Sequence, residues 1–138
     1  MATPKVLFVC LHGSAKSVIA AEHFRRLAAE RGINVGASSA ATEPDSQLPP
    51  KVVHGLMASG IDVSGLRPHR VTRADLESAS RVITFGCELG ELTPTGLAVE
   101  RWDDVPAVSE DFNRARDVIV ARVSRVLDEC AESLSSAI

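Results

Sequence analysis

A cysteine that ends an apolar run, followed six residues later by a lysine and then a serine, is the part of this sequence best suited to chemistry. The segment is Cys10-Leu11-His12-Gly13-Ser14-Ala15-Lys16-Ser17, and a helical pattern begins within it. Backbone N–H groups of such a turn and of a helix N-terminus point into one concavity and favour a bound anion. They would also stabilise a Cys10 thiolate and increase its reactivity at neutral pH. The segment therefore predicts a cysteine that attacks a tetrahedral oxyanion, although a structural cysteine ending a core strand shows the same local pattern.

The residue types within this turn suggest separate roles. Cys10 is the expected nucleophile, Lys16 is the expected cation beside the anion, and Ser17 is placed to donate its hydroxyl to the thiolate. The expected oxyanion-binding residues are Leu11, His12, Gly13, Ser14, Ala15, Lys16 and Ser17. For His12 three possibilities stay open: it donates to the anion, assists deprotonation of Cys10, or points to solvent.

Length and composition are those of an ordinary globular protein, and residues 1–138 are expected to form a single domain. The chain is 45% hydrophobic and 24% charged, and its net charge of −3 offers no basic surface for nucleic acid or an anionic membrane. No apolar run has the roughly 18 residues that a membrane span needs. Three widely spaced cysteines argue against a disulfide framework and favour the cytoplasm. The other histidines lack the spacing of a metal site, so no metal is expected.

Strand-like and helix-like patterns alternate along the chain. Strands are expected at Lys5–Val9, Ile33–Ser38, Arg81–Phe85 and Ala98–Trp102, and helices from Ser17, Pro50 and Thr72 and after an N-cap at Ser109. This order predicts an α/β three-layer sandwich, in which a four-stranded parallel sheet is flanked by helices. Ligands of such sheets bind beyond the carboxyl ends of the strands, where Cys10, Cys87 and the 102–106 segment are expected to meet.

With these residues in hand, the chain resembles the low-molecular-weight protein tyrosine phosphatase superfamily, and within it the thiol-dependent arsenate reductases. The turn stands in the place of the family's Cys-x5-Arg-Ser loop. Four further segments are similar to family motifs in the same order: Ser39-Ala40-Ala41-Thr42-Glu43-Pro44, Gly60-Ile61-Asp62-Val63-Ser64, Thr84-Phe85-Gly86-Cys87 and Trp102-Asp103-Asp104-Val105-Pro106-Ala107. The resemblance implies a cysteine-dependent enzyme without a bound cofactor. Its substrate would be a small oxyanion or a phosphorylated molecule, and an arsenate reductase would need an external thiol or a redoxin as reductant.

Three departures from the family pattern concern the site itself. Lys16 stands where the family has an arginine, and a lysine is a flexible point charge rather than a planar fork that binds two oxygens. Gly13 replaces an asparagine that braces the loop in relatives. Val105 occupies the position of the catalytic aspartate. Two interpretations of the preceding residues stay open: Asp104, or Asp103 beside it, substitutes for the general acid, or both are solvated loop residues or caps.

The choice among activities depends on what the chain lacks. It has no tyrosine and only 4% aromatic residues, and its acid is displaced, so arsenate reduction is favoured ahead of phosphate-ester hydrolysis. Cys87 could match one cysteine of a redox relay or simply end a buried strand, and residues 88–101 contain no second cysteine. The alternative is a weak or inactive homologue, a pseudo-phosphatase that binds oxyanions without turnover.

Overall fold

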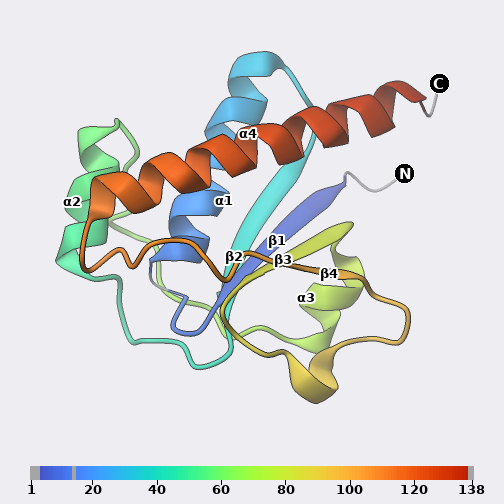
Figure 1. Ribbon diagram of the computed structural model, residues 1–138, viewed down its shortest axis with the longest axis horizontal. Helices are drawn as coiled ribbons and strands as arrows, with labels where there is room; N and C mark the ends of the chain where they lie inside the picture. Colours follow the sequence, from blue (N-terminus) through green and yellow to red (C-terminus); the bar gives the residue numbers. More distant parts are fainter. Residues whose placement is uncertain (1–3, 14, 137–138) are drawn as a thin grey trace.

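The computed structural model describes residues 4–13 and 15–136, and the following helices and strands belong to that part of the chain. One parallel sheet contains its strands in the order β2-β1-β3-β4. The strands are β1 (Lys5–Cys10), β2 (Gly36–Ala41), β3 (Arg81–Phe85) and β4 (Val99–Arg101). The helices are α1 (Lys16–Arg31), α2 (Pro50–Ala58), α3 (Arg73–Ser78), the short 3-10 helix η1 (Gly90–Leu92) and α4 (Phe112–Ser136). Figure 1 shows α1, α2 and α4 together and α3 beyond the other side of the sheet, which confirms the predicted three-layer α/β fold.

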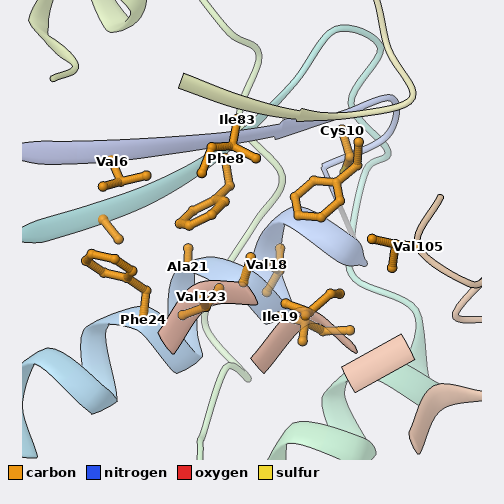
Figure 2. Close-up of a cluster of buried hydrophobic side chains, with 14 of the residues drawn as sticks. Val6, Phe8, Cys10, Val18, Ile19, Ala21, Phe24, Ile83, Val105 and Val123 are labelled. Atoms are coloured by element: carbon orange, nitrogen blue, oxygen red, sulfur yellow. The ribbon is translucent and has the colours of Figure 1, made fainter. Parts of the chain in front are cut away.

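Each face of the sheet has its own apolar core. Val6, Phe8 and Cys10 of β1 pack toward α1 and α4, as Figure 2 shows for the labelled side chains. Leu7 and Val9 belong to the second core, on the side of α3. Side chains of a strand alternate between its two faces, which explains this division. Cys10 is thus the last side chain of β1 on the face that α1 covers.

The second strand begins three residues later than the sequence predicted, at Gly36 rather than Ile33. Ile33 instead completes the end of α1, because its N–H donates to the Ala28 carbonyl at 2.9 Å. Gly32 precedes it in the left-handed conformation, with a φ of 66°, and ends the helix as its place after Arg31 predicts. Pairing with β1 then starts where Gly36 lies opposite Lys5.

The predicted cap of the last helix is also wrong by a few residues. α4 begins at Phe112, and the Asp111 side chain accepts the N–H of Arg114 at 3.1 Å, so Asp111 rather than Ser109 satisfies the first turn. An aspartate and a serine two residues apart are both good N-caps, and the burial of Phe112 decides between them. None of the helices described is both long enough and apolar enough to cross a membrane.

Candidate oxyanion site

The Cys10–Ser17 segment forms the turn between β1 and α1, at the carboxyl end of the sheet. β1 extends to Cys10, and α1 begins at Lys16, one residue before its predicted start. Ser17 is completely buried and Cys10 is 7% exposed. Ser14 lies outside the described residues, so its part in oxyanion binding stays a prediction.

Two groups lie within hydrogen-bonding distance of the Cys10 sulfur. The N–H of Gly13 donates to Sγ at 3.1 Å, and Oγ of Ser17 lies 3.0 Å from Sγ. A thiolate is a stronger acceptor than a thiol, so both donors stabilise the charged form of Cys10. The structure thus brings Cys10 and Ser17 together in the arrangement that their predicted roles require.

The turn is held against the segment that follows β2. Gly13 has a φ of 62°, and a Cβ at this position would lie 2.6 Å from Cβ of Ala41. Glycine is therefore the residue that this close approach requires, and the asparagine of relatives could not occupy the position without a shift. Three backbone hydrogen bonds connect the turn to the 42–45 segment. The N–H groups of Thr42, Glu43 and Asp45 donate, in this order, to the carbonyls of Cys10, Leu11 and His12.

A pocket of about 280 Å³ opens at Cys10. It is lined by Cys10, Leu11, His12, Ala15, Lys16, Phe85, Ala107, Val108 and Ser109. Lys16 supplies a permanent positive charge to this lining, and no ion pair of the described residues engages its ammonium group. No carboxylate is present among the described lining residues. The pocket can therefore attract an anion to the cysteine without repelling it.

Asp104, the predicted general acid, does not line this pocket. Its two carboxylate oxygens accept hydrogen bonds from Arg122 of α4 at 2.7 and 2.8 Å, and its side chain is 75% exposed. The hydrogen bonds from Arg122 hold the pKa of Asp104 below its ordinary value, so the group stays ionised at neutral pH. Asp103 accepts the N–H of Gly86 at 3.0 Å and also lies outside the lining. The geometry therefore gives no support to either aspartate as a proton donor.

Val105 follows these aspartates and packs in the core rather than in the pocket. It is 5% exposed and lies near the Cys10 end of the cluster in Figure 2. An apolar side chain at this position cannot protonate a leaving group, whatever the conformation of the segment. The neighbouring residues 107–109 form a wall of the pocket instead.

The other cysteines differ from Cys10 in their surroundings. Cys87 is 4% exposed in the second core, and its Sγ donates to the carbonyl of Val9 at 3.6 Å. Burial, and to a smaller degree the nearby Cys10, raises the pKa of the Cys87 thiol. Burial also raises the pKa of Cys130, which is half-buried in α4. Both therefore remain thiols near neutral pH, and a redox role for Cys87 stays a prediction.

Phe85 and residues 107–109 contribute to the pocket but were not predicted from the sequence as its walls. Phe85 is the last residue of β3, so the rule that ligands bind beyond the carboxyl ends of strands could have identified it. Ala107 ends the Trp102–Ala107 motif and could have been expected there. Residues 108–109 carry no comparable signal, because only the path of the chain after β4 brings them beside Cys10.

Comparison with known proteins places this geometry in a family. The family model described as low molecular weight phosphotyrosine protein phosphatase matches residues 5–133. A candidate arsenate reductase of Halobacterium salinarum is 30% identical over 132 residues, which cover 92% of this chain and 93% of that protein.

Solved structures show the same fold. The thioredoxin-dependent arsenate reductase of Corynebacterium glutamicum is 26% identical, with a TM-score of 0.80. The match covers 95% of this chain but spans 63% of that one. The protein tyrosine phosphatase of Entamoeba histolytica is 16% identical with a TM-score of 0.83, over 94% of this chain and 97% of its own, and supports the fold alone.

These relatives are phosphatases and arsenate reductases, so they support the superfamily and branch that the motifs indicate and confirm that the chain is an enzyme. They agree with a cysteine-dependent reaction on an oxyanion, and they give no support to an inactive pseudo-phosphatase. The replacement of the loop arginine by Lys16 rests on the sequence pattern. The motifs occur in the order found in the family, and the family model matches nearly the whole length of the chain. The chain therefore belongs to the low molecular weight phosphotyrosine protein phosphatase family.

Proposed function

We propose that this enzyme is an arsenate reductase in which the Cys10 thiolate attacks arsenate, while Lys16 and the N–H groups of the turn bind the anion. One observation carries the proposal. The Cys10 sulfur, with donors from Gly13 and Ser17, opens on a pocket that contains the Lys16 cation and, among its described lining residues, no carboxylate. Hydrolysis of a phosphate ester requires a proton donor for the leaving oxygen unless that group is already a stable anion. Arsenate places a weaker demand on such an acid, because its leaving group is water or hydroxide.

The proposed reaction has two steps. In the first, a bond forms between the Cys10 sulfur and arsenic while an arsenic–oxygen bond breaks. The oxygen takes up a proton and leaves as water, and arsenic remains As(V). In the second, another thiolate attacks the Cys10 sulfur, so that a disulfide forms and arsenic leaves as As(III) with the two electrons of the broken bond. The disulfide must then be reduced before another turnover.

An external molecule is the expected source of the second thiol. Cys87 is buried in the core on the opposite face of the sheet, and burial raises its pKa, so its thiolate is scarce at neutral pH. A low-molecular-weight thiol or a redoxin would need to reach only Cys10, which lies at the open pocket. The thioredoxin-dependent relative from Corynebacterium glutamicum is consistent with the second of these reductants. No resident cofactor is required.

Hydrolysis of phosphate esters is the second candidate. It is favoured by the family description and by the apolar pocket wall of Phe85, Ala107 and Val108, which could contact an organic leaving group. Esters whose leaving groups are stable anions would be the expected substrates, since neither Asp103 nor Asp104 lines the pocket.

The proposal is tested first on the cysteine itself. We expect iodoacetamide at about pH 7 to label Cys10 before Cys87 or Cys130, and we expect phosphate or arsenate to protect it. Peptide mass spectrometry identifies the labelled residue. The protein is then supplied with arsenate and either a small thiol or a thioredoxin system, and arsenite is measured, with Cys10→Ser as the inactive control. A Cys10 that labels no faster than the buried thiols, without protection by either anion, would refute the proposed function.

A further inference from the structure

His12 is a residue of the Cys10–Ser17 turn whose side chain is held by a second segment. Its Nδ1 lies 3.1 Å from the carbonyl oxygen of Glu43 and 3.6 Å from Oδ1 of Asp45. A carbonyl oxygen can only accept, so Nδ1 must carry the hydrogen of this bond, in the neutral ring as well as in the charged one. The same residue is part of the lining of the oxyanion pocket, together with Cys10 and Lys16.

This arrangement makes Nε2 the atom at which the ring gains or loses a proton. Among the described residues, the hydrogen bonds and ion pairs of the His12 side chain involve Nδ1 alone. With a proton on Nε2 the ring is a cation with a free N–H donor. Without it, Nε2 is an acceptor and cannot bind a fully ionised oxyanion. Histidine side chains ordinarily change charge between about pH 5 and 8, where an enzyme would encounter both states.

We propose that the bound oxyanion is held by two separate cations, Lys16 and protonated His12, and that the His12 contact is lost as the pH rises. An arginine would offer two parallel donors from a single side chain, whereas the Lys16 ammonium is a single point charge. Nε2–H of His12 supplies a second donor from the same turn. This inference rests on the proposed function and deepens it, because it assigns a pH-dependent contact to the same substrate pocket.

Several charged or titratable groups surround the ring. The Asp45 carboxylate lies 3.6 Å from Nδ1 of His12, and Lys16 and Cys10 line the same pocket. Residues 107–109, across the pocket, carry no titratable side chain. Among the described residues, charged or titratable side chains on the segments around the ring include Cys10, Lys16, Glu43, Asp45 and Arg70, the last of which binds the Thr42 carbonyl. Across the pocket, Lys51 donates to the carbonyl of Ser109 at 3.0 Å.

The test uses sulfate, which stays a dianion from about pH 5.5 to 8.5, in a Cys10→Ser background, so that neither the ligand nor the thiol titrates. Calorimetry gives the sulfate dissociation constant across this range for the background protein and after adding His12→Gln. His54→Gln is the matched control, because His54 is an exposed histidine of α2 that does not line the pocket. We expect affinity to fall about tenfold with rising pH in the background and control proteins, the effect of one charge-assisted hydrogen bond. With His12→Gln, we expect it to be weak and independent of pH.

The outcomes separate this inference from the proposed function. Sulfate binding with the same pH dependence in the His12→Gln protein and its background would overturn the inference alone, since an anion would still bind beside residue 10. No sulfate binding at any pH would also overturn it, and arsenite production by the unaltered protein would then decide the function independently.

Discussion

Gly13→Ala tests whether the close packing of Gly13 against Ala41 keeps the Gly13 N–H in hydrogen-bonding distance of the Cys10 sulfur. The φ of Gly13 is 62°, a region that costs an L-residue about 1–2 kcal/mol. The new Cβ would lie 2.6 Å from Cβ of Ala41, and forcing a methyl group into a packed site costs about 1–3 kcal/mol more. Alanine also restricts the unfolded chain, which offsets about 0.4–1 kcal/mol. We therefore expect the free energy of unfolding to fall by about 2–4 kcal/mol.

Gly32→Ala is the matched control for the backbone term. Gly32 has nearly the same φ, 66°, but a Cβ there would have no atom within 4 Å. Its substitution should therefore cost only about 1 kcal/mol, the conformational part of the effect. The double variant Gly13→Ala with Ala41→Gly removes the opposing methyl group. In the Ala41→Gly background, Gly13→Ala should therefore cost about as little stability as Gly32→Ala does in the unaltered protein.

Urea unfolding measures the free energies, and the rate of Cys10 alkylation at about pH 7 measures the consequence for the site. We expect alkylation to slow in Gly13→Ala, because the turn must shift and its N–H must move away from the sulfur. Equal losses of stability in Gly13→Ala and Gly32→Ala would show that Ala41 does not confine the turn. An unchanged alkylation rate in a clearly destabilised protein would show that this N–H does not stabilise the thiolate.

Three further predictions concern ionisable groups. Ser17→Ala removes the hydroxyl beside the Cys10 sulfur and should slow its alkylation at neutral pH by about ten- to a hundredfold, because a hydrogen bond to a charged group contributes about 1.5–3 kcal/mol. An unchanged rate would exclude that contact from thiolate stabilisation. Burial raises the pKa of Cys87, so mass spectrometry should find it labelled only at alkaline pH or in urea, and rapid labelling of the native protein at neutral pH would contradict this environment. Burial lowers the pKa of His23 below the ordinary value of 6.5, so the unfolded chain binds more protons than the folded one just below that pH. The free energy of unfolding should therefore fall as the pH is lowered from about 7 to 5, and a slope that is no smaller in His23→Gln would refute the assignment.

The elements of the fold were largely predictable, because their signals are local. The strand Arg81–Phe85 has the expected bounds at both ends, since a segment rich in β-branched and aromatic residues there stops at Gly86. Thr72 caps α3 by accepting the N–H of Asp75, and the Asp75 side chain accepts the N–H of Thr72 in return. Both signals lie within a few residues of the structure that they specify, so no knowledge of distant contacts was needed.

The surroundings that the sequence did not reveal depend on contacts between distant parts of the chain. Asp104 lies two residues before the proline of the family motif, and its partner, Arg122, is eighteen residues away on α4. Nothing in the residues between Asp104 and Arg122 predicts that α4 passes close to this segment. The need for glycine at position 13 also depends on a distant contact, because a Cβ there would collide with Ala41 of β2. Local patterns can therefore locate the reactive turn but cannot identify the groups that surround it.

Lys16 and the absence of a carboxylate from the described pocket lining affect different parts of the reaction, and this difference can distinguish the candidate substrates. In both reactions, with arsenate and with a phosphate ester, negative charge develops on the oxygens around the attacked atom. Lysine in place of an arginine fork should therefore raise both activation barriers, by up to about 3 kcal/mol each. The lack of a nearby acid slows only the ester whose leaving group needs a proton. Lys16→Arg should consequently raise both rates by a similar factor and leave their ratio unchanged. The ratio of arsenite formation to hydrolysis of an alkyl phosphate is therefore the informative measurement. A protein that hydrolyses alkyl phosphates as readily as it reduces arsenate must obtain a proton donor at this pocket from a group other than Asp103 or Asp104, and the proposed preference for arsenate would then be wrong.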